Sequence, residues 1–393
     1  MPHSNASDGG DDEPPYKVVD VFCGAGGLSL GLDSPERLNG LGDLGYDLGH
    51  DDGRGFETVM GVDHHLPAAR TFRREFPDAA VFERDLHEIQ YFTAWKDADV
   101  VVGGPPCGGF SNLSQTKTDD LDDHRNKLWG QFFRVVEAVD PDVFLIENVP
   151  RFLSADEGRQ AAEHAELLGY TTVVDTLWAH QYGVPQKRKR VFMFGSKLGV
   201  PFFPETTDGS TRTFRDAVDD LPLEPSGENL HDPRENVTEK SRKRMEHVPP
   251  GGNRTDIPRE LLPDCWIDKE GGTDLFGRLA WDEPSVTIRT EFYKPEKGRY
   301  LHPTENRSIT VREAARLQTF PDDFGFCGTS RNDIASQIGN AVPPKLAYHL
   351  GEAIMAHLDG ENSVIDAKAD LPDGALKKAV RIGDSKQSAL GSY

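Results

Sequence analysis

The chain has 393 residues, and 36% of them are hydrophobic, which is enough for two domains or for one large domain with insertions. No apolar run approaches the roughly 18 residues that a membrane helix needs, and the acidic N-terminus contains no apolar signal region, so we expect a cytoplasmic protein with no membrane partner. The four cysteines lie far apart in the sequence, which argues against a disulfide framework and against a metal site.

The charge of the chain bears on its partners. A formal net charge of −22 by itself argues against a nucleic-acid partner, because phosphates repel it. A protein that works in concentrated salt, as in a halophile, escapes this objection, since at ~1 M salt the Debye length is only ~3 Å. The alternative is an acidic but ordinary cytosolic protein. Positive charge gathers at 186–190 (QKRKR) and 240–244 (KSRKR), which fits either a DNA surface or the solvated face of a helix or loop.

The elements begin after residues 1–15, an acidic segment with the composition of a disordered tail. Apolar runs predict a buried strand at 16–22 and further strands at 57–63, 79–85, 97–104 and 142–149. Helical spacing and helix-start signals predict helices at 66–76, 124–139, 310–317 and 343–358. Strands that alternate with helices imply an α/β fold with a doubly wound, mostly parallel sheet. The Gly- and Asp-rich stretch 33–55 is expected to be a surface insertion.

The composition of the sequence changes near residue 200, beyond which Pro, Gly and charged residues interrupt every periodic pattern. We therefore predict two domains and two tails. These are the acidic tail at 1–15, a cofactor-binding domain at 16–200, a smaller irregular domain at 201–306, a return to the first domain at 307–360, and a polar tail at 361–393.

A glycine-rich loop, DVFCGAGGLSLGL, follows the first predicted strand. Its glycines, Gly24, Gly26 and Gly27, depart from the G-x-G-x-x-G spacing of a dinucleotide site, which counts against NAD. Asp63 ends the second strand, where an acid can bond ribose hydroxyls, and Asp85 ends the third, where an acid can bond an adenine amino group. The loop has no Lys or Arg for phosphates. An adenosine without phosphates is the ligand that remains, and S-adenosylmethionine fits; the alternative is a plain glycine turn.

A second loop, GGPPCGGFS at 103–111, places Cys107 behind two prolines and among four glycines. An inert core cysteine needs no such surroundings. A nucleophile that must meet a ligand at close range does, because glycines let a loop close against it.

These segments and their order resemble the DNA cytosine-5 methyltransferase family over about residues 17 to 357. The motifs that carry the resemblance are DVFCGAGGLSLGL, GGPPCGGFS, ENV (147–149), QYGVPQKRKRVF (181–192), RSITVREAARLQTFPDDF (307–324) and QIGNAVPPKLA (337–347). The resemblance implies a Rossmann-like fold that binds S-adenosylmethionine, with a target-recognition domain at 201–306. It also implies methyl transfer to carbon 5 of a flipped-out cytosine in a specific double-stranded DNA sequence.

The resemblance also implies a set of site residues. The residues expected around the cofactor are Phe22, Gly24, Gly26, Gly27, Leu28, Asp63, His64, Asp85, Leu86, Pro106, Leu128, Asn340 and Val342. Three positions depart from the usual pattern. Asp63 stands where the family usually has Glu, His64 where an apolar or aromatic side chain usually covers the adenine, and Gly108 where Gln usually follows the nucleophile.

The chemistry gives each catalytic residue a role. Carbon 5 of cytosine is a poor nucleophile until a thiolate, that of Cys107, adds to carbon 6. Glu147 is expected to bond N3 and the exocyclic amine, which takes up the charge that develops as sulfur adds. Arg190, with Arg188 near it, is expected to bind the O2 side of the base or the loop phosphates and to favour the thiolate.

Other functions remain open from the sequence. A tRNA cytosine-5 methyltransferase would use the same catalytic parts, and a DNA-binding relative without activity would keep the fold. A dehydrogenase is disfavoured by the glycine spacing. We expect a monomer, no bound metal, and DNA as the partner; a cognate restriction endonuclease is a further partner that the sequence does not test.

Overall fold

The computed structural model describes most of the chain. The described residues are 13–41, 54–106, 128–154, 156–207, 211–224, 230–232, 237–267, 271–272 and 274–360. Cys107 and the rest of 107–127, both predicted tails apart from residues 13–15, and most of the predicted insertion lie outside them. No helix among these residues is long and apolar enough to cross a membrane.

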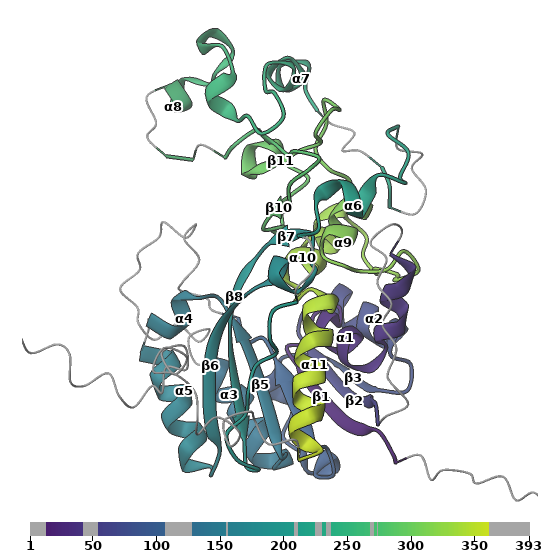
Figure 1. Cartoon of the computed structure of the whole chain (residues 1–393), viewed down its shortest axis with the longest axis vertical. Helices are drawn as coiled ribbons and strands as arrows, with labels where there is room; N and C mark the ends of the chain where they lie inside the picture. Colours follow the sequence, from purple (N-terminus) through teal and green to yellow (C-terminus); the bar gives the residue numbers. More distant parts are fainter. Residues whose placement is uncertain are drawn as a thin grey trace, which may run out of the picture.

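A seven-stranded sheet, in the order β3-β2-β1-β4-β5-β8-β6, forms the centre of the molecule (Figure 1). Its strands are β1 (Tyr16–Val21), β2 (Phe56–Asp63), β3 (Ala80–Glu83), β4 (Val100–Gly103), β5 (Val143–Asn148), β6 (Thr171–Trp178) and β8 (Lys189–Ser196). The first five run parallel to one another, whereas β8 is antiparallel to both β5 and β6. This confirms the expected α/β class with a mostly parallel sheet.

Helices cover both faces of the sheet. They are α1 (Gly27–Asp33), α2 (Leu66–Glu75), α3 (Leu128–Val139), α4 (Arg151–Ser154), α5 (Asp156–Leu167) and α11 (Pro344–Leu358). Two more helices, α9 (Val311–Leu317) and α10 (Arg331–Asn340), lie above the sheet and pack with α2 (Figure 1). Along β4, Val101 packs in a cluster with residues of α3 and α5, while Val100 and Val102 pack with residues of α1 and α11. Alternate residues of this central strand are thus buried on opposite faces, as a sheet between two helical layers requires.

Part of the predicted surface insertion is buried instead. Leu38 and Leu41 are at most 1% exposed and pack in the cluster that contains Phe72 and Phe76 of the α2 region. The expectation of a surface segment is wrong for these two residues, because their apolar side chains fill space beside α2.

The upper lobe, defined here as the described residues from 237 to 301, stands above the sheet (Figure 1). It contains α7 (Glu239–Glu246), α8 (Asp264–Ile267), β9 (Gly277–Arg278), β10 (Ser285–Val286) and β11 (Arg299–Leu301); β10 pairs with β7 (Gln186–Lys187). A small core of Met245, Val248, Ile257, Phe276 and Leu301 supports it. The short α6 (Phe214–Val218) packs instead with α9 through Phe214 and Val311.

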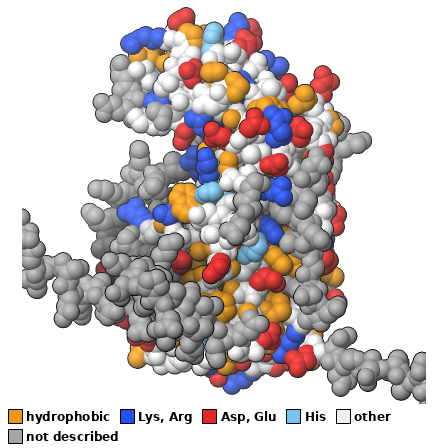
Figure 2. All heavy atoms as spheres, viewed as in Figure 1, with side chains coloured by type: hydrophobic (Ala, Val, Ile, Leu, Met, Phe, Trp, Pro, Cys, Tyr) orange, Lys and Arg blue, Asp and Glu red, His pale blue; other side chains and the backbone are white. Residues whose placement is uncertain are grey.

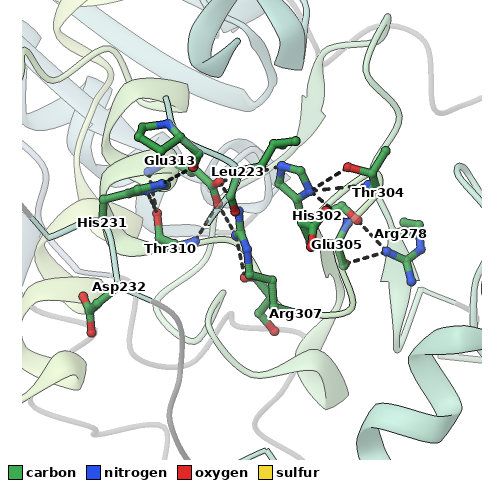
Figure 3. A network of polar contacts seen from close by, with 12 residues as sticks. Leu223, His231, Asp232, Arg278, His302, Thr304, Glu305, Arg307, Thr310 and Glu313 are labelled. Atoms are coloured by element: carbon green, nitrogen blue, oxygen red, sulfur yellow. Dashed lines mark hydrogen bonds and ion pairs between the residues drawn. The ribbon is translucent and has the colours of Figure 1, made fainter. Parts of the chain in front are cut away.

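Buried polar contacts join the upper lobe to α9 (Figure 3). Arg278 is 3% exposed and donates to the main-chain oxygens of His302 and Glu305, both at 2.7 Å. Arg307 forms two contacts with Glu313, at 2.8 and 2.9 Å, and Glu313 caps the first turn of α9. Guanidinium groups need such partners when they are buried, so this network fixes where the lobe stands on the sheet domain.

Candidate active site

The site lies where the parallel strands β1, β2, β4 and β5 end, because their carboxyl ends share one edge of the sheet. The glycine loop follows β1, Asp63 ends β2, Gly104 follows β4, and Glu147 is the next-to-last residue of β5. β8 runs the other way, so its first residues, including Arg190, reach the same edge. The topology thus brings together segments from four of the sequence motifs.

The glycine loop turns sharply after β1. Phe22, Gly24 and Gly26 have φ of 58°, 56° and 94°, in the left-handed region that favours glycine. The Asp63 carboxylate holds the loop, accepting from the main-chain N–H of Gly24 at 2.9 Å and of His65 at 2.7 Å. A Cβ built on Gly24 meets no atom within 4 Å, so open space lies against the loop at this point.

The loop leads into α1, whose first turn packs closely against the segment before α11. A Cβ on Gly27 would come within 2.3 Å of the Val342 carbonyl oxygen, so only glycine fits there. Leu28 and Val342 are buried in one cluster. The structure therefore brings these predicted cofactor residues together, although they are more than 300 positions apart in the sequence.

The residues expected at the adenine lie next to the loop on the β2–β3 side. Phe22 packs against the cluster that contains the buried Leu86. Asp85 accepts from the N–H of His87 at 2.9 Å, and this bond is the main cause that lowers the pKa of its carboxyl group. The His64 side chain is 66% exposed, with Nδ1 3.7 Å from Asp63 Oδ1. Asp85 is therefore ready to accept a bond as a carboxylate, and His64 lies at the rim.

Glu147 and Arg190 form the polar centre of the site. Arg190 Nε lies 2.8 Å from Glu147 Oε1, and the two side chains are only 17% and 11% exposed. Glu147 Oε1 is buried and makes no aligned hydrogen bond with the described residues. The ion pair keeps the carboxylate in place while leaving it capacity to accept from a ligand.

The segment that leads to Cys107 packs on this pair. A Cβ on Gly104 would come within 3.1 Å of Glu147 Oε2, and Asn148 donates to the Pro105 oxygen at 3.1 Å. Residues 107–127 lie outside the described part of the chain. Of the two residues that flank them, Pro106 is exposed and Leu128 is half-buried. Cys107 itself lies within 107–127, so its predicted position stays a prediction.

Arg188 has different surroundings from Arg190. It is 1% exposed and donates to the main-chain oxygens of Ile288 at 3.3 Å, Gly339 at 3.1 Å and Asn340 at 3.5 Å. Burial, with the nearby charge of Arg190, lowers the pKa of its guanidinium well below the usual value. Its bonds tie the arginine motif to the upper lobe and to the end of α10, which is the geometry of a positioning residue rather than one that touches a base.

The family of the chain follows from comparison with known proteins. The family model described as C-5 cytosine-specific DNA methylase matches residues 16–356. The chain belongs to this family. Its activity is that of a DNA cytosine-5 methyltransferase, and the dehydrogenase alternative is therefore rejected.

Individual relatives agree with this assignment. The chain is 35% identical over 349 residues to the Type II methyltransferase M1.HphI of Haemophilus parahaemolyticus, covering 86% of each chain. It is 32% identical to the Type II methyltransferase M.Eco47II of Escherichia coli, covering 88% of this chain and 80% of the relative. Among solved structures, a prophage-encoded E. coli protein described as a DNA modification methyltransferase is 26% identical, with a TM-score of 0.61 over 88% of this chain and 99% of its own.

One buried acid of this cytosine-5 methyltransferase was missed in the sequence. Asp20, in β1, is 1% exposed; it accepts from Ser29 Oγ at 2.8 Å, and its Oδ1 has no hydrogen bond among the described residues. Burial raises its pKa to about 7, and the nearby Asp63 adds to the effect. The signal was available, because an acid inside the apolar run YKVVDVF is unusual.

The other thiol near the site is not activated. Cys23 is a buried residue of the glycine loop, and burial raises the pKa of its thiol well above the usual value. Among the described residues no group of three or more His, Cys, Asp or Glu side chains is arranged to hold a metal ion.

Proposed function

We propose that the chain transfers a methyl group from S-adenosylmethionine to carbon 5 of cytosine in a specific double-stranded DNA sequence. The reaction proceeds through a flipped-out base and a covalent bond to Cys107. The observation that carries this proposal is the Glu147–Arg190 pair beside Gly104, where the chain leads to Cys107. The carboxyl group that this ion pair orients can accept from the exocyclic amine of a cytosine and can share a proton with N3.

The described residues fit the proposed cofactor. The open space at Gly24 admits a ligand close to the main chain, Asp63 lies where ribose hydroxyls would donate, and Asp85 and Leu86 lie where an adenine edge would bind. Phe22, Leu28 and Val342 supply apolar surface, and Asn340 lies at the end of α10 beside them. When bound, S-adenosylmethionine supplies an electrophilic methyl group.

The residues of the chain have separate tasks in this proposal. The Cys107 thiolate forms a bond to carbon 6, and the electron pair of the 5,6 double bond moves toward carbon 5. Glu147 holds the proton or hydrogen bond at N3 that accommodates the developing charge. Arg190 orients Glu147 and faces the O2 side of the base. After methylation, loss of the carbon 5 proton and of the Cys107 sulfur restores the ring.

We further propose that the upper lobe reads the DNA sequence and that the enzyme acts in the cytoplasm as a monomer in concentrated salt. Because counterion release contributes little there, base contacts and packing should carry more of the affinity than usual. The named relatives are Type II methyltransferases, so a cognate restriction endonuclease is a reasonable partner to seek.

A labelling experiment tests the function. Purified protein is given labelled S-adenosylmethionine in molar KCl with unmethylated DNA or, separately, with tRNA, and labelled DNA is sequenced after bisulfite treatment. Protected cytosines in one short context support the proposal and supply the target sequence. Label only in tRNA overturns the substrate.

Cys107→Ala separates chemistry from binding. The variant should bind the target duplex as the wild type does and transfer no methyl group. Residual methylation at the wild-type rate would show that Cys107 is not the nucleophile.

A further inference from the structure

An exposed tryptophan stands at the same edge of the sheet as Glu147 and Arg190. Trp178 ends β6 and is 37% exposed, so part of its ring is open to solvent. It pairs with Lys189 in the strand register, and its neighbour Leu177 pairs with Arg190. Trp178 and Lys189 therefore lie one residue from Leu177 and Arg190 at the same end of the sheet, with their side chains on the opposite face.

Lys189 and His180 pack on this tryptophan. The Lys189 ammonium lies 5.3 Å from the centre of the Trp178 ring, and the His180 ring meets it nearly edge-on, at 5.6 Å and 75°. A cation held over an indole face keeps its charge and is already partly ordered. Binding an anion there loses less side-chain freedom than at an unrestrained lysine.

The charge of Lys189 is not compensated in the described part of the chain, where no carboxylate lies within 4 Å of it. This is notable in a protein with 66 acidic and 44 basic residues. Lys197, the residue that follows the other end of β8, provides a comparison. Its ammonium also packs on an aromatic ring, Tyr170 at 4.9 Å, but it is paired with Asp140.

The surroundings of this cluster fit a nucleic acid strand. Figure 2 shows a hollow between the upper lobe and the sheet domain, along which basic, histidine and hydrophobic side chains gather. Three residues along β8 and one strand spacing put the Cα atoms of Lys189 and Glu147 about 11 Å apart, with the two side chains leaving opposite faces at this end of the sheet. A phosphate one or two nucleotides from a base held at Glu147 lies within that range.

We propose that Trp178, His180 and Lys189 form a phosphate-binding platform for the DNA strand that carries the target cytosine. Lys189 binds a backbone phosphate next to the flipped nucleotide, and Trp178 and His180 hold its side chain. The proposal rests on the proposed function, since it takes the substrate to be duplex DNA. The bond is ionic, so it adds affinity and register without sequence preference.

The test measures binding of a fluorescent duplex that the wild type methylates, by anisotropy, from 0.1 to 1 M KCl. Four variants are compared: Lys189→Gln, Lys189→Arg, Trp178→Ala, and the matched control Lys197→Gln from the other end of β8. Lys189→Gln should weaken binding about three- to tenfold at the lowest salt and reduce the slope of log K against log salt by about 0.9, the value of one phosphate contact. Lys189→Arg should restore both, and Trp178→Ala should lose part of the affinity.

The outcomes separate the two proposals. If the wild type methylates DNA but Lys189→Gln changes affinity and slope no more than Lys197→Gln does, the platform is wrong and the proposed function stands. If the wild type labels tRNA and neither binds nor methylates the duplex, the proposed function fails and the platform fails with it. Unchanged S-adenosylmethionine affinity in each variant, measured by calorimetry, shows that a loss of DNA binding is local.

Discussion

Replacing Arg188 with Met should destabilise the protein by about 3 kcal/mol. The substitution keeps most of the side-chain volume but leaves the carbonyls of Ile288 and Gly339, and the more distant one of Asn340, without their donor. Two well-formed bonds, with an unsatisfied buried carbonyl costing about 1–3 kcal/mol each, give a loss of about 2–6 kcal/mol. Part of this loss is offset, because the variant no longer buries the charge of a side chain that is only 1% exposed.

Urea unfolding and steady-state kinetics measure the two consequences. Arg188→Met should lower the unfolding midpoint and raise KM for both DNA and S-adenosylmethionine, because its partners lie in the upper lobe and at the end of α10. Lys187→Met is the control: this exposed neighbour pairs with Glu283 at 3.5 Å, and its loss should change stability by less than about 0.5 kcal/mol. If Arg188→Met keeps wild-type stability and both KM values but loses kcat, Arg188 acts in the chemistry and the positioning role is wrong.

Two further substitutions test the site. Gly104→Ala places a Cβ 3.1 Å from Glu147 Oε2, so the carboxylate must shift, and kcat should fall about tenfold with little change in the urea midpoint. The control is Gly130→Ala, where a Cβ meets no atom within 4 Å and kcat should not change. Equal activity of the two variants would contradict the prediction. Asp20→Asn tests the raised pKa. A carboxyl group with a folded pKa of about 7 and an unfolded pKa near 3.8 stabilises the protein below pH 4, and this stabilisation is lost as pH rises to 7. In urea unfolding, the free energy of unfolding of the variant should therefore rise relative to that of the wild type by up to about 4 kcal/mol from pH 4 to pH 8. If the difference between the two proteins does not vary with pH, the pKa of Asp20 is not raised in the folded protein.

The sequence predicted the part of the fold in which apolar runs are continuous. All five expected strands are present, within about three residues at each end. The pattern is clearest in β1, β4 and β5, because a strand covered on both faces is apolar throughout. β6 and β8 were not predicted. β6 lies at the sheet edge, where TTVVDTLW mixes exposed and buried positions, and β8 begins with charged residues that reach the active site. Edge position and function both weaken the pattern on which sequence reasoning depends.

The two arginines show why the site could be predicted only in part. The resemblance implied that Arg188 lies near Arg190 at the O2 side of the base or at the loop phosphates. The backbone breaks between β7 and β8: the Arg188 N–H donates to the Gln186 oxygen at 2.9 Å, an i to i+2 turn. That turn directs one arginine into the protein and leaves the other beside Glu147. The same region places Lys189 on Trp178, so three consecutive cations, at 188, 189 and 190, meet main-chain oxygens, an aromatic ring and a carboxylate in turn. A basic cluster in a sequence therefore predicts charge near a site, but only the local backbone decides which cation is buried on main-chain oxygens, which packs on a ring and which pairs with a carboxylate.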